Sequence, residues 1–209
     1  MLKNLILWPL SILYGIGISI RNRLFNLGIL KIREFDIPII CVGNITVGGT
    51  GKTPHTESLI NELKNDYRVA CLSRGYKRKT SGFVLATETS TANEIGDEPM
   101  QIKNKFPKII VAVDADRVRG IKKLMQLPEK PEVIILDDGF QHRYVKADIN
   151  IMLIDYNRPI YEDHLLPLGR LRESIHAKDR ANYIIVTKCP AYNSGRYVLF
   201  LLLQLRNDV

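Results

Sequence analysis

The residues best suited to chemistry form a glycine-rich stretch: Thr46, Val47, Gly48, Gly49, Thr50, Gly51, Lys52 and Thr53. Glycines let the backbone turn its N–H groups toward phosphate oxygens. A lysine at this spacing reaches the β- and γ-phosphates of a nucleotide, and the hydroxyl that follows it holds Mg²⁺. The usual pattern opens on glycine, and Thr46 stands at that position. The stretch therefore indicates a phosphate-binding loop, with a plain glycine-rich turn and a surface lysine as the alternative.

A pair of aspartates, Asp137 and Asp138, directly follows the apolar run of residues 133–136. A carboxylate at the end of a buried strand is the usual partner of a phosphate-binding loop, because it completes the shell of Mg²⁺. A simple Asp-Asp-Gly turn would give the same local sequence. Together with Lys52 and Thr53, the pair predicts a metal site in which the two aspartates divide their roles between Mg²⁺ and the hydrogen bonds around it.

Asp97 opens a helix-like segment in the run Gly-Asp-Glu-Pro of residues 96–99. An acid here is by default an N-cap or a first-turn residue that stabilises the helix. The alternative is a general base that accepts the proton of a hydroxyl attacking the γ-phosphate, a reaction that needs positioning more than covalent chemistry. These residues alone favour the capping role.

Several arginines could bind an anionic substrate or neutralise phosphoryl charge. Arg74 lies beside Tyr76 in the basic loop of residues 73–79, which could equally be a solvated loop. The other arginines form two pairs, Arg117 with Arg119 and Arg170 with Arg172. Taken alone, each of these four is more often a surface residue.

Histidine and cysteine spacing does not indicate a metal cluster. His142, which follows Gln141, is either a polar site residue or a turn residue. The three cysteines are far apart, and the simplest interpretation is reduced thiols in a cytosolic protein. They are Cys41, Cys71 and Cys189.

Strand-like and helix-like segments alternate from residue 37 onward, which predicts an α/β fold with a mostly parallel sheet and helices on both faces. Ligands in such folds bind beyond the carboxyl ends of the strands. Polar residues come just after the expected strands at 50–53, 73–78, 114–119 and 137–142. We expect a short β excursion at residues 83–85. The expected strands are 37–42, 68–72, 109–113, 133–136, 149–154 and 183–187, and the expected helices are 54–63, 97–104 and 116–127.

The N-terminus is both apolar and basic. The chain has 209 residues and a net charge of +8, and residues 1–35 hold five cations against Glu34 alone. Residues 5–20 are free of charge but short for a span, which needs about 20 apolar residues. We therefore expect an interfacial helix, with a short span or a core helix as alternatives. The pattern favours an anionic membrane surface, and no aromatic-basic pattern supports nucleic-acid binding.

Taken together, these segments resemble the tetraacyldisaccharide 4′-kinase (lipid A 4′-kinase) family, in order and spacing as well as in sequence. The apolar-basic N-terminus also agrees, and Thr46 is ordinary at its position in that family. The matching segments are GNITVGGTGKTP (43–54), LSRGYKRK (72–79), GDEPM (96–100), DADRVRG (114–120), LDDGFQHR (136–143), LPLGRLRE (166–173) and VTKCP (186–190).

The resemblance implies a P-loop fold and ATP- and Mg²⁺-dependent phosphorylation of the 4′-hydroxyl of a tetraacylated glucosamine disaccharide 1-phosphate. This lipid A precursor would be met at the cytoplasmic face of the cell inner membrane, with the N-terminal helix bound peripherally or as an anchor. No protein partner is implied. The implied roles are ATP and Mg²⁺ binding by residues 46–53, metal binding by Thr53, Asp137 and Asp138, a catalytic base at Asp97, headgroup contacts by Arg74, Tyr76 and Gln141, and phosphate contacts by Arg117 and Arg172.

The resemblance also predicts the organisation of the chain. Residues 1–35 would form the membrane-associated helix region and residues 36–190 the kinase core. Family members continue into a C-terminal region with a histidine that pairs with the catalytic aspartate, whereas residues 191–209 end in an apolar tail that we interpret as a truncation or frame disruption. A nucleotide-binding remnant with little turnover is therefore the alternative function. A switch GTPase is disfavoured, because residues 187–190 lack the Asn and Asp of guanine recognition.

Overall fold

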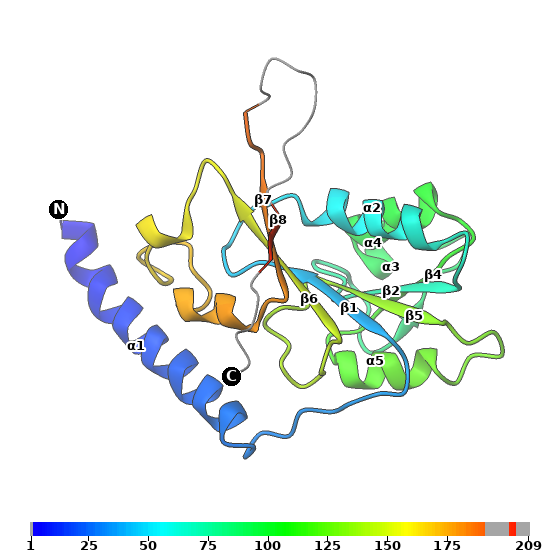
Figure 1. The fold of residues 1–209 in the computed structure, drawn as a ribbon, viewed down its shortest axis with the longest axis horizontal. Coiled ribbons are helices and arrows are strands. Elements are labelled where there is room, and N and C mark those ends of the chain that lie inside the picture. The colour runs from blue at the N-terminus through cyan, green and yellow to red at the C-terminus, as the bar shows by residue number, and fades with distance from the viewer. Residues whose placement is uncertain (1, 191–200, 204–209) are drawn as a thin grey trace. The chain divides into compact units, whose positions relative to one another are not determined.

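The computed structural model describes residues 2–190 and 201–203 (Figure 1). The chain forms two compact units, each assembled from separate stretches. Unit 1 consists of Met1–Ile32, Gly43–Gly51 and Asn150–Val209, and unit 2 consists of Arg33–Val42 and Lys52–Ile149. The sequence-based division at residues 35 and 190 stays a prediction.

Unit 2 is a parallel sheet covered by helices, with the strand order β3-β4-β2-β5-β1. All pairings among these strands are parallel except the edge pairing of β3 with β4. The strands are β1 (Ile39–Gly43), β2 (Val69–Ser73), β3 (Val84–Leu85), β4 (Ile110–Val113) and β5 (Val133–Asp137). The helices are α2 (Lys52–Leu63), α3 (Ala92–Ile95), α4 (Asp97–Lys105) and α5 (Arg117–Leu124).

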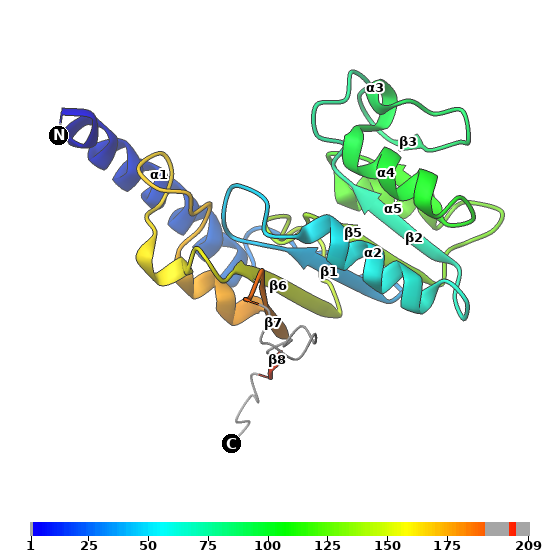
Figure 2. The ribbon, with the colours of Figure 1, turned by 90° about the horizontal axis from the view of Figure 1, so that it is seen from above.

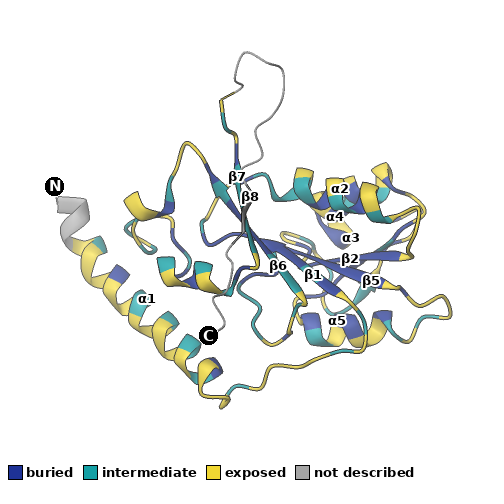
Figure 3. Cartoon of the chain, viewed as in Figure 1, coloured by how far each residue is buried: buried dark blue, intermediate teal, exposed yellow. Residues whose placement is uncertain are grey.

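The two central strands of unit 2 are buried at every position, as a sheet covered on both faces requires (Figure 3). Helices α2 and α4 lie on one face of the strands and α5 lies on the other (Figures 1 and 2). Helix α5 packs so closely that a Cβ on Gly120 would lie 2.8 Å from the Leu72 side chain. Its N-cap Asp116 accepts a hydrogen bond from the Arg119 backbone at 3.1 Å. This packing sets Arg117 at the carboxyl ends of the strands.

Unit 1 contains the long N-terminal helix and the last strands. Strands β6 and β7 are parallel, and β7 pairs antiparallel with β8. The elements are α1 (Leu2–Asn26), β6 (Ile149–Asp155), β7 (Tyr183–Thr187), β8 (Leu201–Leu203) and the 3-10 helices η1 (Ile160–Glu162) and η2 (Ile175–Arg180).

Helix α1 is attached to unit 1 by polar contacts rather than by a buried stripe. Ser11 Oγ donates to the Leu165 carbonyl at 2.8 Å, and Tyr14 Oη donates to the Arg172 carbonyl at 2.9 Å. Within residues 6–26 of the helix only Ser11 and Phe25 are buried, and Trp8 and most of the isoleucines and leucines are exposed (Figure 3). None of the helices in the described residues combines the length and apolar content needed to cross a membrane.

The predicted α/β class and the mostly parallel sheet are confirmed, and the expected strands and helices are found within a few residues of their predicted ends. Helix α1 extends six residues beyond the expected apolar run, to Asn26. Its last turns gain a tertiary contact, since Asn22 Nδ2 donates to Glu173 Oε2 at 2.9 Å. The short helix α3 was not predicted, although Thr91 and Glu94 form a capping box at its start.

Candidate nucleotide and phosphoryl-transfer site

The first part of the glycine-rich loop lies in unit 1, directly after β1. Thr46 forms an antiparallel bridge with Leu171, and Val47 N donates to the Arg170 carbonyl at 2.8 Å. Gly48 has a φ of 117°, a conformation that favours glycine. The segment of residues 166–173 singled out in the sequence therefore flanks the loop and fixes its backbone.

The loop is also held by the last residue of β7 and by the residue that follows it. Thr187 Oγ1 donates to the Thr50 carbonyl at 3.0 Å, and Lys188 Nζ donates to the Gly49 carbonyl. The Thr50 side chain is buried and accepts a hydrogen bond from Asn44 Nδ2 at 2.7 Å. Hydrogen bonds to the carbonyls of Gly49 and Thr50 therefore fix this part of the loop backbone.

Lys52 and Thr53 are the first two residues of α2, in unit 2. Lys52 Nζ lies 3.7 Å from Asp138 Oδ1, with side chains that are 11% and 28% exposed. Asp138 has a φ of 50°, which is uncommon for a residue other than glycine and concentrates at functional sites. A helix N-terminus, a half-buried lysine and an aspartate at a strand end are the parts from which a phosphate site is built.

Asp137, the last residue of β5, is fully buried. Its Oδ1 accepts a hydrogen bond from Thr56 Oγ1 at 3.0 Å, while its Oδ2 has no partner among the described residues. Burial and the charge of Glu98 raise the pKa of Asp137 to about 6, against the hydrogen bond from Thr56. A buried carboxylate oxygen that lacks a donor can be satisfied by a cation.

The donor set around Asp137 fits Mg²⁺. This ion is usually held by one or two carboxylates, with phosphate oxygens and water in the remaining positions. No group of three or more His, Cys, Asp or Glu residues that could hold a metal occurs in the described residues, and Mg²⁺ with a nucleotide does not need one. Asp137, Asp138 and the Thr53 hydroxyl are the residues that would hold it.

The predicted base and the predicted substrate loop are in contact within unit 2. A Cβ on Gly96 would lie 3.0 Å from the Tyr76 carbonyl, and one on Gly75 would lie 3.0 Å from the Ile95 carbonyl. Asp97 is exposed in the first turn of α4, where Gly96 is the N-cap. Tyr76 is 71% exposed beside this turn. The structure thus places an accessible carboxylate beside an accessible aromatic and basic loop.

The sequence profile of the family described as tetraacyldisaccharide-1-P 4′-kinase matches residues 3–199. The chain belongs to this family. It is 61% identical over 188 residues to the tetraacyldisaccharide 4′-kinase of Parabacteroides distasonis, covering 89% of this chain and 51% of that protein. It is 62% identical over 186 residues to the kinase of the same name from Phocaeicola vulgatus, covering 88% of this chain and 51% of that protein. The chain therefore spans about half the length of these relatives.

A solved structure agrees with the fold. The crystal structure of the "apo" form of LpxK from Aquifex aeolicus in complex with ATP is 39% identical in sequence and has a TM-score of 0.82. The match covers 94% of this chain and 63% of that chain. The α/β core described here is thus the core of a tetraacyldisaccharide 4′-kinase family member.

Arg117, for which a phosphate contact is predicted, and its neighbour Arg119 both bond to protein groups in this family member. Arg117 is buried, and its guanidinium donates to the carbonyls of Asp114 and Asp137, the latter at 3.4 Å. Arg119 binds the buried Asp114 carboxylate through Nε and Nη2 at 2.8 and 2.7 Å. Arg117 is therefore placed to support the backbone of Asp137, and its contact with a phosphate stays a prediction.

The remaining predicted residues lie near the two aspartates or the loop. Gln141 is half-buried in the turn that follows Asp138. Arg172 is half-buried, and its backbone N–H donates to the Ile45 carbonyl at 2.7 Å, just before the loop. Their roles toward substrate stay predictions.

Sequence reasoning did not single out Glu98, although it is next to Asp97. Its charge is the second cause of the raised pKa of Asp137, so this carboxylate lies close to the expected metal site. The run Gly-Asp-Glu-Pro contained the signal, but adjacent acids on a helix cannot be ranked without the fold. Arg158 and the Asp155–Lys188 ion pair were also missed.

Proposed function

We propose that the chain binds ATP with Mg²⁺ on the loop of residues 46–53 and transfers the γ-phosphoryl group to a lipid A precursor. The acceptor is the 4′-hydroxyl of a tetraacylated glucosamine disaccharide 1-phosphate. The observation that carries the proposal is the Lys52–Asp138 ion pair beside the buried, half-satisfied carboxylate of Asp137. Membership of the 4′-kinase family supplies the substrate class.

The nucleotide half of the reaction depends on charge and position. Lys52 neutralises the β- and γ-phosphates, the loop N–H groups orient them, and Asp137 and Asp138 with Thr53 hold the metal. When bound there, Mg²⁺ would supply positive charge that offsets the negative charge of the transferring phosphoryl group. Phosphoryl transfer asks little covalent chemistry of the protein, so these contacts supply most of the catalysis.

The acceptor half of the reaction would use the contact between the turn of residues 96–97 and the loop of residues 74–76. Asp97 takes the proton of the attacking 4′-hydroxyl, and its exposure leaves it accessible to a bulky substrate. Arg74, Tyr76 and Gln141 bind the headgroup, and Arg172 binds phosphate.

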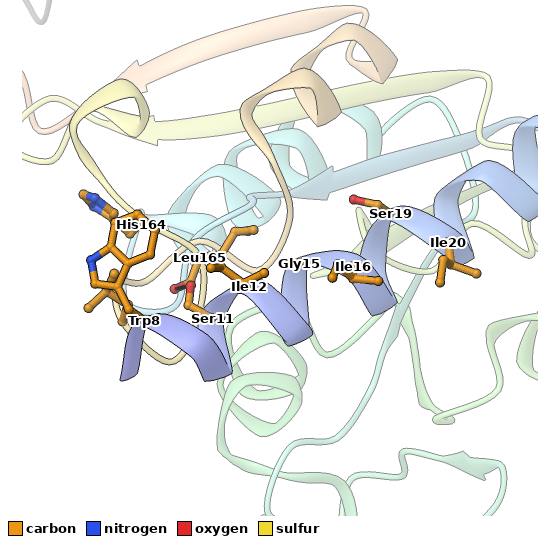
Figure 4. A pocket seen from close by; sticks show the side chains of 10 residues that line it. Trp8, Ser11, Ile12, Gly15, Ile16, Ser19, Ile20, His164 and Leu165 are labelled. Carbon is orange, nitrogen blue, oxygen red and sulfur yellow. Dashed lines mark hydrogen bonds between the residues drawn. The ribbon is translucent and has the colours of Figure 1, made fainter. Parts of the chain in front are cut away.

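Helix α1 would bring the enzyme to its lipid at the cytoplasmic face of the inner membrane. A cavity of about 480 Å³ lies along it, lined by Trp8, Ile12, Ile16, Ile20, Leu165 and Leu168 among others (Figure 4). The Trp8 ring packs edge-on against His164, with ring centroids 6.2 Å apart. An apolar cavity on an exposed apolar helix suits acyl chains and the bilayer interface.

The test is transfer of ³²P from ATP to tetraacyldisaccharide 1-phosphate in detergent micelles, with Lys52→Ala as the control. The expected result is a phosphorylated lipid from the wild-type chain and a loss of about 10²–10³-fold in rate for the variant. Equal product from both proteins, or none from either, would contradict catalysis by this site.

The second candidate function is binding of Mg·ATP without turnover. It stays open because the chain spans about half the length of the relatives it matches. Calorimetry measures the binding of Mg·ATP, and the ³²P assay measures transfer. Binding with transfer supports the first candidate, and binding without transfer supports the second. GTP competing with ATP at equal affinity would instead indicate a nucleotide switch.

A further inference from the structure

A turn in unit 1 lies beside the glycine-rich loop and carries an arginine that the proposed chemistry has not used. The turn runs from Asp155, at the end of β6, to Arg158, whose N–H donates to the Asp155 carbonyl at 3.0 Å. Asn157 N donates to Asp155 Oδ1, also at 3.0 Å. These two bonds fix the direction in which the chain leaves the strand.

The same aspartate ties the turn to the loop. Asp155 is 6% exposed, and its Oδ2 accepts a hydrogen bond from Lys188 Nζ at 2.7 Å. Lys188 Nζ also donates to the Gly49 carbonyl. The hydrogen bond from Lys188 helps to hold the pKa of Asp155 below its ordinary value, so the ion pair persists at neutral pH. One ammonium group therefore connects the turn that carries Arg158 with the backbone of the loop.

The guanidinium of Arg158 lies close to Gly48 of the glycine-rich loop. A Cβ built on Gly48 would lie 3.7 Å from Arg158 Nη1. The two residues line a small hollow together with Thr46, Val47, Asp163 and Arg170 among others. Arg158 is exposed, and no hydrogen bond or ion pair of its guanidinium occurs among the described residues. It is a cation held next to the loop with donors available for a ligand.

The place of Gly48 in the loop bears on which phosphate Arg158 would contact. Lys52 and Thr53 stand at the helix end of the loop, whereas Gly48 stands at its strand end. The donors of the loop itself wrap the inner phosphates, with Lys52 adding charge at the β- and γ-positions. The terminal phosphate carries the most negative charge and is the group transferred, with ADP as the leaving group, so a guanidinium beside the loop would have its largest effect there.

We propose that Arg158 binds the terminal phosphate of the nucleotide and stabilises the charge on it during transfer. The inference rests on the proposed function, since it takes ATP as the ligand of the loop. A planar guanidinium suits this role because it can bond two phosphate oxygens at once, which the single ammonium of Lys52 cannot do. Arg158 then distinguishes a triphosphate from a diphosphate.

The test compares ATP and ADP affinity of the full chain by isothermal titration calorimetry with Mg²⁺, for wild type, Arg158→Gln and Arg158→Lys. Loss of a charged hydrogen bond predicts at least about a tenfold weaker affinity for ATP in Arg158→Gln, with ADP affinity unchanged and a smaller loss in Arg158→Lys. The matched control is Lys178→Gln, which removes an exposed cation of unit 1 that pairs with Asp179 at 2.9 Å. It should leave both affinities unchanged.

The outcomes separate this inference from the function on which it rests. If wild type binds ATP and Arg158→Gln loses ATP and ADP affinity equally, or loses neither, the inference is overturned while nucleotide binding stands. If wild type binds neither nucleotide, both are overturned. Thermal unfolding should show the same midpoint for wild type and Arg158→Gln, because the side chain is exposed.

Discussion

The loop of residues 46–50 and the turn at Asp137–Asp138 contrast in how their polar groups are satisfied. In the loop, the carbonyls of Gly49 and Thr50 accept side-chain donors, and the N–H of Val47 is bonded to the chain. In the turn, a buried carboxylate oxygen has no partner in the described part of the chain, and Asp138 has a positive φ. The loop is stable as it stands, whereas the turn keeps a free-energy cost that a bound cation would relieve. Preorganisation and strain therefore lie in different segments of the chain.

Lys52→Ala is expected to have the largest effect on activity, because it removes the cation that pairs with Asp138 and is proposed to contact the phosphates of the nucleotide. Loss of one well-placed donor to a transferring group lowers the rate by about 10²–10³-fold. Thermal stability should change little, since at 3.7 Å the Lys52–Asp138 ion pair is longer than a hydrogen bond. Turnover and melting are measured on the same preparation. A large loss of stability would show that Lys52 is structural.

Thr56→Val sharpens the contrast, because it removes the hydrogen bond that Thr56 Oγ1 donates to Asp137 Oδ1. A bond to a buried charge contributes about 1.5–3 kcal/mol, and that loss should appear at pH 8, where the carboxyl is ionised. Below the pKa of about 6 the carboxyl is protonated in the folded protein, so the loss should shrink at pH 5. Urea unfolding at both pH values measures it. An equal loss at both would argue that Asp137 is not ionised at pH 8.

Gly48→Ala tests the loop side of the contrast. A side chain at a φ of 117° is strained, and the expected destabilisation is about 1–3 kcal/mol. Gly49→Ala is the matched control, because nothing lies within 4 Å of a Cβ there and its φ is not positive. Chemical unfolding of the two variants compares them directly. Equal stability would mean that the loop tolerates rearrangement and is not preorganised.

Thr187→Val should have the smallest effect. It removes the donor to the Thr50 carbonyl at nearly constant volume, at an expected cost of about 1 kcal/mol. ATP affinity should fall by a similar free energy if this bond holds the loop in its binding shape. Unfolding and calorimetry give the two numbers. Lost stability with ATP affinity unchanged would separate the bond from loop geometry.

The fold was predictable where one local pattern decides the structure. Apolar runs such as residues 133–136 end in aspartates, and this pattern is enough to place both the strand and the carboxylates at its end. The glycine-rich loop is equally local. Helix α1 was underestimated because its last turns are fixed by Asn22 and Glu173, which are 151 residues apart in the chain.

Some parts of the site could not be predicted from the sequence, because they depend on contacts between segments that are far apart in the chain. Thr187 and Lys188 were considered as an incomplete guanine-recognition motif, and in the structure both side chains hold the loop. Asp155 ends strand β6, and Arg158 lies in the turn after it, where no sequence motif marks it. Their importance comes from one ion pair with Lys188, which no spacing in the chain predicts.

The most direct test of the contrast is the stability of Asp137→Asn with and without Mg·ATP. In the ligand-free protein at pH 8 the substitution removes a buried charge whose pKa shift, from 3.8 to about 6, corresponds to roughly 3 kcal/mol. The buried amide of the new asparagine lacks a full set of partners, which costs about 1–2 kcal/mol and reduces the gain in stability by that amount. The cost of the ionised carboxyl is absent below pH 3.8, grows as the pH rises to about 6 and is complete above it.

The account predicts that Asp137→Asn melts about 2–8 °C above wild type without ligand, and that only wild type gains further stability from Mg·ATP over ATP alone. A variant that melts below wild type without ligand, or that gains as much from Mg²⁺ as wild type, would contradict the claim that this buried carboxylate is kept for a cation.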